Sequence, residues 1–393
     1  MAGHSGPPDF ENTQIAFQSK TDSQIKKAYF LFQMLNIPFL NQAGTLLAQV
    51  ALSLGMPIHG LIQATVFDQF CGGVSLEDSK SRVEALARHG VGTSLDYSVE
   101  AVDGDQGYAD TVEETLNMVQ FAAENPSVEF VVVKPTGIGS MSLMEKVSKE
   151  RPLTQEEELD LQAIRSRLDL IAKAVSDAGQ RLFIDAEDSW YQDCVDMLAR
   201  ELMQKYNREK VCIYSTIQFY RKGRLEFLKR ELERSHEGNY RLGFKLVRGA
   251  YLEKERERAA LLSYPDPIQD TKEDTDRDYN LGVELCLENI DKMAFCAATH
   301  NERSAALLCQ KMSACDIEAG NTNVFFSQLF GMGDQISYNL ARAGYNVCKY
   351  LPYGPVVEMI PYLIRRAQEN SSIAGQASRD LRLLKNEIRR RKI

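Results

Sequence analysis

The stretch RLFIDAEDSWYQDCVDMLARELMQKYNREKVCIYSTIQF, residues 181–219, contains a strand pattern, a helix pattern and a second strand pattern in that order. Residues 181–187 and 211–219 are short runs rich in aliphatic, aromatic and β-branched side chains, which predict buried strands. Residues 191–206 between them carry apolar side chains at helical spacing. This order predicts two parallel strands joined by a helix.

The same alternation continues on both sides of this stretch. Eight strands are predicted, at residues 91–96, 129–134, 181–187, 211–219, 242–249, 292–299, 323–327 and 345–351. Helical patterns lie between them, at residues 110–123, 154–178, 191–206, 223–232, 276–290 and 302–312. Eight such units in about 290 residues favour an α/β fold of the (β/α)8 TIM-type barrel over an open doubly wound sheet. No GxGxxG motif follows an early strand, so a Rossmann dinucleotide-binding half is not expected.

Composition and charge exclude some classes of protein. The chain has 393 residues, of which 44% are hydrophobic and 26% charged, and its net charge is −9. An acidic chain of this kind is not expected to be a general nucleic-acid binder, which needs a basic surface to neutralise phosphates. Its eight cysteines form no CxxC pair and no cluster with histidine at metal-ligand spacing, so reduced thiols and no metal site are expected.

The N-terminal region has an unusual composition. Residues 28–67 contain no Asp, Glu, Lys or Arg, but prolines and glycines divide them into pieces too short to span a membrane. Short packed helices are predicted there, with a membrane-surface element as the alternative. The first residues, MAGHSGPPDFENTQ, show neither a signal core nor a basic amphipathic pattern, so a cytoplasmic or already processed protein is expected. The basic C-terminal end, NEIRRRKI from Asn386, is expected to be a solvated helix end, with contact to an anionic membrane as the alternative.

One helix near the C-terminus carries two adjacent arginines. Within YLPYGPVVEMIPYLIRRAQEN, residues 350–370, a helix entered at Gly354-Pro355 places one phenol, two guanidiniums and one carboxylate on a common face, namely Tyr362, Arg365, Arg366 and Glu369. The opposite face is apolar and expected to pack inward, through Val356, Val357, Ile360, Leu363, Ile364 and Ala367. Paired guanidiniums on a fixed helix suit a planar carboxylate. An ordinary amphipathic helix with two solvated arginines is the alternative.

Polar residues also follow the predicted strands, where a (β/α)8 barrel places its chemistry. They are Lys134, Asp185, Glu187, Gln218, Lys245, Arg248, Tyr251, His300, Asn301, Gln328 and Tyr350. Some have structural alternatives, because Lys134 and Asp185 could be a buried pair and the residues around His300 could cap a helix. Neither a metal motif nor a GxSxG nucleophile motif is present. Cations and hydrogen-bonding groups together suit an anionic cofactor and an anionic substrate.

Six motifs in this order resemble the flavin-dependent proline dehydrogenases. They are FIDAED (183–188), IQFY (217–220), KLVRGAYLEKE (245–255), ATHNE (298–302), QLFGMGDQIS (328–337) and KYLPYGPVVEMIPYLIRRAQENSS (349–372). The resemblance covers residues 129–372. Within it, the motifs KLVRGAYL and YGPVVEMIPYLIRRA resemble the monofunctional, eukaryotic-type branch of the family. The resemblance implies three parts: an N-terminal helical region at 1–84, an FAD-binding (β/α)8 barrel at 85–375 and a basic C-terminal helix or tail at 376–393.

The resemblance also implies roles for individual residues. Arg365 and Arg366 would bind the proline carboxylate, Lys134 and Asp185 would close the other side of the pocket, and Leu329, Tyr350 and Tyr362 would pack around the ring. The implied FAD contacts are Gln218, Lys245, Val247, Arg248, Gly249, Tyr251, Thr299, His300, Asn301, Gln328 and Glu369. Bacterial bifunctional members have arginine where this chain has Lys245, beside flavin N5, and tryptophan where it has Leu252. No catalytic base is assigned.

The implied reaction is oxidation of L-proline to Δ1-pyrroline-5-carboxylate by hydride transfer from proline C5 to FAD N5, with a quinone as electron acceptor and a possible peripheral membrane contact. A phenol at Tyr350 would crowd a 4-hydroxyl group, which favours proline over hydroxyproline. The alternatives are a hydroxyproline dehydrogenase, another flavin barrel oxidoreductase and a non-catalytic barrel that binds an amino acid. The expected location is cytoplasmic in a bacterium, and mitochondrial after processing in a eukaryote. The sequence does not indicate an oligomeric state.

Overall fold

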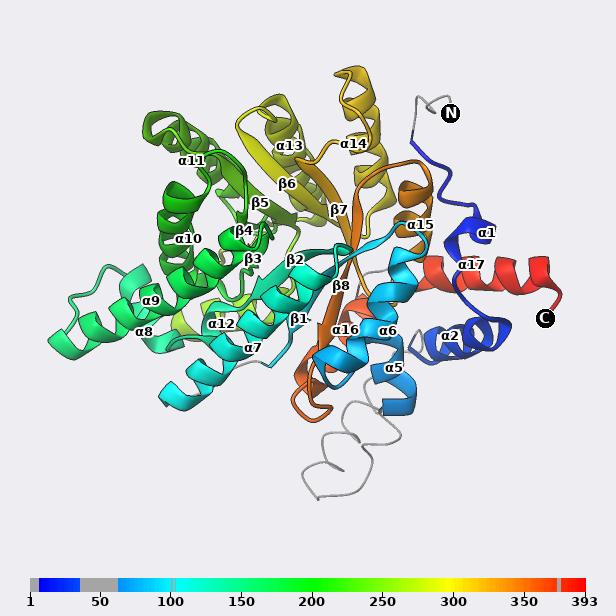
Figure 1. Cartoon of the computed structure of the whole chain (residues 1–393), viewed down its shortest axis with the longest axis horizontal. Coiled ribbons are helices and arrows are strands. Elements are labelled where there is room, and N and C mark those ends of the chain that lie inside the picture. The colour runs from blue at the N-terminus through cyan, green and yellow to red at the C-terminus, as the bar shows by residue number, and fades with distance from the viewer. Residues whose placement is uncertain (1–6, 36–62, 100–101, 103, 373–375) are drawn as a thin grey trace. The chain divides into compact units, whose positions relative to one another are not determined.

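The computed structural model describes residues 7–35, 63–99, 102, 104–372 and 376–393. Eight strands form a closed barrel in chain order, with parallel neighbours, which confirms the predicted (β/α)8 fold (Figure 1). Each predicted strand overlaps an observed one. The strands are β1 (Gly92–Tyr97), β2 (Val128–Val133), β3 (Leu182–Ile184), β4 (Ile213–Gln218), β5 (Leu242–Val247), β6 (Met293–Ala298), β7 (Val324–Leu329) and β8 (Val347–Tyr353).

The chain divides into two compact units. The first unit consists of Met1–Ser98, His300–Glu302 and Ser327–Ile393, and the second unit of Val99–Thr299 and Arg303–Phe326. Each unit therefore contains barrel strands together with helices. The polar residues that follow the strands belong partly to one unit and partly to the other.

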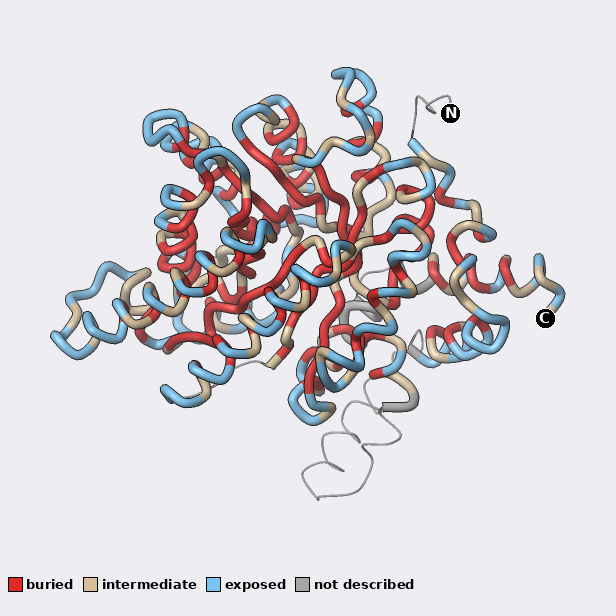
Figure 2. The backbone as a smooth tube through the Cα atoms, viewed as in Figure 1, coloured by how far each residue is buried: buried red, intermediate tan, exposed pale blue. Residues whose placement is uncertain are grey.

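Aromatic side chains fill the core of the second unit. The rings of Phe130 on β2 and Phe183 on β3 stack with their centroids 3.9 Å apart, and the rings of Tyr214 and Phe325 meet Phe130 edge-on at 5.3 and 5.0 Å. The strands of this unit are buried along most of their length, as Figure 2 shows in red. This packing fixes the strand ends, from which the polar side chains project.

The helices of the second unit follow the predicted pattern, with two notable differences in length. The helix predicted at 110–123 already begins at Gly104. Thr154 and Glu157 form a capping box at the start of α9, which fixes where that helix begins. The helix predicted at 223–232 continues to Gly238, because Glu231 and Ser235 are buried polar residues that a purely apolar pattern does not detect. The helices and 3-10 turns are α7 (Gly104–Glu124), η2 (Pro135–Gly137), α8 (Met141–Ser148), α9 (Gln155–Asp177), η3 (Ser189–Tyr191), α10 (Gln192–Tyr206), α11 (Arg224–Gly238), α12 (Leu252–Leu262), α13 (Lys272–Glu288) and α14 (Glu302–Ala314), whose first residue belongs to the first unit.

Strands β1 and β8 pair in parallel in the first unit, with Thr93 opposite Lys349 and Ser94 opposite Tyr350. A hydrophobic cluster joins residues from both ends of the chain, including Phe32, Phe70 and Leu383. Other elements of this unit are α1 (Thr13–Ala16), α2 (Asp22–Leu35), the π-helical turn η1 (Gln63–Phe67), α5 (Asp68–Phe70), α6 (Leu76–Ala87), α15 (Asp334–Arg342), α16 (Ile360–Ser372) and α17 (Gln376–Arg391).

The basic segment from Asn386 forms the end of helix α17, as predicted, and Arg389, Arg390 and Lys392 are exposed. It is not solvated on all sides, because Glu387 is fully buried under Arg390 and Arg391, and Leu383 and Leu384 are buried earlier in the same helix. Apolar residues spaced along this basic segment explain the difference, since they give the helix a face that packs. Within the described residues, no helix has the length and apolar character needed to cross a membrane. Most of the uncharged segment 28–67 lies outside the described residues, so the prediction of short helices there stays a prediction.

Candidate functional site

The ends of β3 and β5 in the second unit hold a buried ion pair. Lys245 lies on β5, and its ammonium group pairs with the carboxylate of Asp185, which follows β3. The two side chains are 7% and 12% exposed, respectively. The Lys245 Nζ atom also lies 4.9 Å from the centroid of the Phe183 ring, whose face attracts cations. Two residues that the sequence predicts in the site are thus brought together.

Hydrogen bonds also connect the ends of β2, β3 and β4. The hydroxyl and the backbone N–H of Thr136 donate to the Glu187 carboxylate, at 2.7 and 3.1 Å. The side-chain amide of Gln218 donates to the Glu187 carbonyl at 2.9 Å, and its oxygen is buried without a partner among the described residues. Lys134, which follows β2, is buried as well. These bonds hold the chain segments beyond three strands in fixed positions.

Arg248 forms a third group of contacts, beyond the end of β5. Its guanidinium donates to Asp276 at 2.6 Å, to the Thr299 hydroxyl at 2.8 Å and to the Ser304 hydroxyl at 2.9 Å. Burial opposes ionisation of Asp276, but Lys272 and Arg248 outweigh it and lower the pKa of this carboxyl group. A guanidinium has five N–H donors, so Arg248 keeps two beyond these bonds within the described part of the chain. Sequence reasoning found Arg248 and Thr299 but not Asp276.

In the first unit, His300 is held as a neutral ring. Its Nε2 atom accepts the backbone N–H of Leu329 at 3.2 Å. Burial, helped by the positive charges of Lys349 and Arg366, lowers the pKa of His300 to about 3. A neutral imidazole that accepts at Nε2 carries its proton on Nδ1. Position and tautomer of His300 are therefore both defined by its surroundings.

Helix α16 carries the two arginines, and its buried face matches the prediction in part. Leu363 is buried in the hydrophobic cluster as expected, whereas the helix begins at Ile360 rather than at Pro355, and Val357 is 57% exposed. Tyr362 and Arg366 are buried as well, at 4% and 7% exposure, and the Arg366 guanidinium carbon lies 5.2 Å from the Tyr362 ring centroid. The alternative of two solvated arginines therefore fails for Arg366, whereas Arg365 is partly exposed.

The remaining predicted residues are placed as follows. Gln328, at the end of β7, accepts the Ser337 hydroxyl at 2.7 Å, and Tyr350 on β8 accepts the Phe330 N–H with its carbonyl at 2.9 Å. The side chain of Glu369 lies outside the described ones. The predicted site residues divide between the two units. Those in the second unit are Lys134, Asp185, Gln218, Lys245, Val247, Arg248, Gly249, Tyr251 and Thr299. Those in the first unit are His300, Asn301, Gln328, Leu329, Tyr350, Tyr362, Arg365, Arg366 and Glu369.

Sequence reasoning missed the buried ion pair of Lys349 in the first unit. Lys349 on β8 is 1% exposed and pairs with Asp334, the first residue of α15, at 2.9 Å. Its signal was a charged residue within the apolar run Val347–Tyr353 of β8, directly before Tyr350. A lysine inside a buried strand requires a partner, so the sequence could have shown that Lys349 is paired, but not with which residue.

These features define a (β/α)8-barrel protein whose cationic and hydrogen-bonding groups follow its strands. The family model described as "Proline dehydrogenase" matches residues 79–379, and the chain belongs to this family. Proline dehydrogenase 1, mitochondrial, of Dictyostelium discoideum is 31% identical over 98% of this chain and 77% of the relative. The carbapenem antibiotics biosynthesis protein CarD of Pectobacterium carotovorum subsp. carotovorum is 35% identical over 85% of this chain and 86% of the relative.

A solved structure is similar in fold. Proline utilization A (PutA) from Bdellovibrio bacteriovorus, inactivated by N-propargylglycine, matches with a TM-score of 0.72 at 20% identity. The match covers 91% of this chain and 38% of that much longer one. At this identity the likeness supports the barrel fold alone.

Proposed function

We propose that the protein oxidises L-proline to Δ1-pyrroline-5-carboxylate with FAD as its cofactor and passes the electrons to a quinone. The observation that carries the proposal is the buried Arg366 beside Arg365, on the helix where the family resemblance places carboxylate binding. A guanidinium held in place by burial can bind a planar carboxylate through two parallel N–H bonds, so a bound carboxylate suits Arg366 and Arg365. FAD would supply the acceptor for the hydride leaving proline C5.

Some of the proposed substrate residues bind the charged carboxylate of proline, and others contact its apolar ring. Arg365 and Arg366 bind the proline carboxylate in this proposal, while Tyr362, Tyr350 and Leu329 contact the ring. Lys134 and Asp185 complete the substrate set, and the ion pair with Lys245 orients Asp185. Such positioning supplies much of the rate in a reaction whose chemistry belongs to the cofactor.

The donor set in the second unit fits FAD. Arg248 has two N–H donors beyond its bonds to the described residues, which suits a pyrophosphate. The buried Gln218 oxygen, which lacks a partner among the described residues, suits a ring edge that carries an N–H donor. Lys245, Val247, Gly249, Tyr251 and Thr299 complete the set in this unit, and His300, Asn301, Gln328 and Glu369 complete it in the first unit. No residue is assigned as the base for the ring nitrogen, and proline entering as the free amine would need none.

Quinone as acceptor rests on fewer observations. Helix α2 exposes Phe30 to 64% and Met34 to 39%, one turn apart, and these side chains would suit a peripheral contact with a membrane that contains quinone. If the source is a eukaryote, we propose a mitochondrial location, as in the names of the Dictyostelium and human relatives. Higher turnover with liposome-borne quinone than with a short-chain analogue would support the contact, and equal turnover would contradict it.

The decisive experiment is the visible absorption spectrum of the purified protein before and after anaerobic addition of L-proline. Flavin bands that bleach with proline, and not with trans-4-hydroxyproline, would confirm cofactor, reaction and specificity together. Bands that persist would leave a flavin barrel with another substrate. Absence of bands after supplying FAD would overturn the proposal and favour a barrel that only binds an amino acid.

The similarity to CarD favours one second candidate. That relative is named for carbapenem biosynthesis and matches over most of both chains, so another proline-like ring carboxylate is a candidate substrate. The same bleaching assay, run with five-membered ring amino acids that carry substituents, separates the two. Methylenetetrahydrofolate in parallel tests for a folate-linked flavin barrel.

Arg366→Ala tests the carboxylate role. We expect a severe rise in KM for proline, because losing a desolvated charge contact costs about 2 to 5 kcal/mol. Arg389→Ala, which removes an exposed arginine of α17, is the matched control and should leave KM unchanged. An unchanged KM in Arg366→Ala with normal FAD content would refute the role.

A further inference from the structure

Lys349 uses all of its donors on one segment of the chain. Its ammonium donates to the carbonyl of Met332 at 2.5 Å, contacts the carbonyl of Leu329 at 3.4 Å and pairs with Asp334 at 2.9 Å. Three acceptors match the three N–H donors of an ammonium group. All three acceptors belong to the segment that joins β7 to α15, here called the 329–334 segment. Lys349 thereby fixes both ends of this segment to β8.

Two glycines let the 329–334 segment lie close to its neighbours. Gly331 has φ +80° and Gly333 has φ +63°, conformations that other residues adopt at a cost. A Cβ atom on Gly331 would lie 2.1 Å from the Gln69 carbonyl oxygen, and one on Gly333 would lie 2.8 Å from Nδ1 of His300. Gln69 also donates its side-chain amide to the Gly331 carbonyl at 2.8 Å. The segment is thus packed against His300 on one side.

The same lysine influences His300 by its charge. The charged groups facing the imidazole are Lys349 from β8, Arg366 from α16 and Asp334 from α15. Burial and the two cations lower the pKa of His300, while Asp334 opposes them. A neutral ring leaves a lone pair on Nε2 for the Leu329 N–H. Protonation of Nε2 would place two N–H groups against each other and displace Leu329.

We propose that Lys349 is a positioning residue for the substrate pocket: it holds the 329–334 segment so that Leu329 keeps its place and His300 keeps one neutral tautomer. The role of Leu329 against the proline ring rests on the proposed function, whereas the coupling between Lys349 and His300 does not. Lys349 touches neither substrate nor cofactor in this proposal and acts through the segment that it holds.

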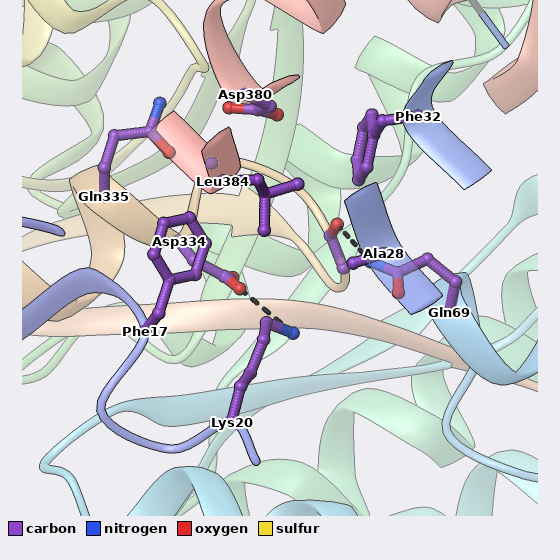
Figure 3. A pocket seen from close by; sticks show the side chains of 11 residues that line it. Phe17, Lys20, Ala28, Phe32, Gln69, Asp334, Gln335, Asp380 and Leu384 are labelled. Carbon is purple, nitrogen blue, oxygen red and sulfur yellow. Dashed lines mark hydrogen bonds and ion pairs between the residues drawn. The ribbon is translucent and has the colours of Figure 1, made fainter. Parts of the chain in front are cut away.

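The test compares Lys349→Met with Lys20→Met. Lys20 also pairs with Asp334, at 3.2 Å, but makes no bond to the carbonyls of the segment (Figure 3). Nitrogen-15 NMR of histidine-labelled protein without ligands reports the tautomer and titration of each of the five histidines, with His300 assigned through His300→Gln. We expect His300 to stay neutral and protonated at Nδ1 from pH 5.5 to 8 in the unchanged protein and in Lys20→Met. In Lys349→Met it should titrate, or mix tautomers, within this range.

Steady-state kinetics give the second arm. With FAD saturating, Lys349→Met should raise KM for proline by about tenfold to a hundredfold, more so at low pH, with a smaller change in kcat. If the unchanged protein neither binds FAD nor oxidises proline, the proposed function fails while the NMR arm still tests Lys349. If Lys349→Met does not fold, the double variant Lys349→Met/Asp334→Leu removes the pair without leaving a buried charge. A His300 signal that is the same in the folded single or double variant as in the unchanged protein overturns the proposal.

Discussion

Among the described residues, a buried lysine–aspartate pair lies in each unit, and the two pairs differ in the parts of the molecule that they hold in place. Lys245 and Asp185 in the second unit follow or end barrel strands, and their side chains are 7% and 12% exposed. Lys349 and Asp334 in the first unit are 1% and 10% exposed, and the lysine also binds two backbone carbonyls. The first pair consists of side chains that the resemblance assigns to substrate and cofactor. The second pair is committed to the protein's own backbone.

This difference separates two uses of the same chemistry. Taking two charges out of water costs several kcal/mol per ion, so other interactions of a buried pair must offset this cost. The Lys349 pair holds a loop in one conformation, and the Lys245 pair holds two strand-end side chains beside a proposed ligand. Breaking the former should mainly affect stability, and breaking the latter should mainly affect ligand binding.

The largest effect is expected for Lys349→Met on stability. Removing the ammonium leaves Asp334 buried with only the partly exposed Lys20, so the free energy of unfolding should fall by about 3 to 5 kcal/mol. Urea unfolding followed by circular dichroism measures it. Lys20→Met should cost less than about 1 kcal/mol, because its side chain is 21% exposed. Equal losses in the two variants would show that the backbone bonds of Lys349 carry no stability.

How much of this was accessible from the sequence depends on the interaction concerned. The strands and their polar ends were predictable, because local alternation and apolar runs define them, and Lys245 and Arg248 were found in this way. The Lys349–Asp334 pair was missed because its carboxylate comes from a different element, and no local pattern announces such a partner. On α16, Leu363 was correctly expected to pack inward, but Val357 was assigned wrongly because a helix entry at Pro355 was assumed and the helix begins at Ile360. Burial of Tyr362 depends on packing by residues from both ends of the chain, which no pattern within residues 350–370 reveals.

The second-largest effect on stability is expected for Asp380, whose carboxylate lies near the Lys349–Asp334 pair. It lies on α17, and its carboxylate is buried beside Gln335 and the backbone of Gly333 (Figure 3). Burial and the nearby Asp334 raise the pKa of Asp380 from 3.8 to about 7. The folded state therefore binds this proton more tightly than the unfolded state, and stability should fall as pH rises from about 4 to about 7, by up to about 4 kcal/mol.

Asp380→Asn should remove this pH dependence and stabilise the protein at pH 8. The groups facing Asp380 are Asp334, Lys349, Gln335 and the Gly333 backbone. Asparagine has nearly the same shape as aspartate, so this substitution removes the charge that these groups meet and changes little else. Urea unfolding at pH 5 and pH 8 measures the change. Asp177→Asn, at an exposed position, is the control and should leave the pH dependence as it is. The same slope of stability against pH in Asp380→Asn would mean that Asp380 is not the group responsible.

The smallest effect on stability, and the sharpest contrast with Lys349, is expected for Lys245→Met. Asp185 loses its partner, but it lies at a strand end and is slightly more exposed, so the loss should be about 1 to 3 kcal/mol. The main change should appear in the flavin, as weaker FAD binding, a shifted visible spectrum and a changed reduction potential, because the variant removes a positive charge from the proposed flavin site. Lys205→Met, which breaks an exposed pair with Asp169 in the same unit, should change none of these. The contrary outcome is that Lys245→Met destabilises the protein as much as Lys349→Met does and leaves the flavin spectrum and reduction potential unaltered. Both pairs would then stabilise the protein's own backbone. The distinction between a pair that holds a loop and a pair that supports a ligand would be wrong.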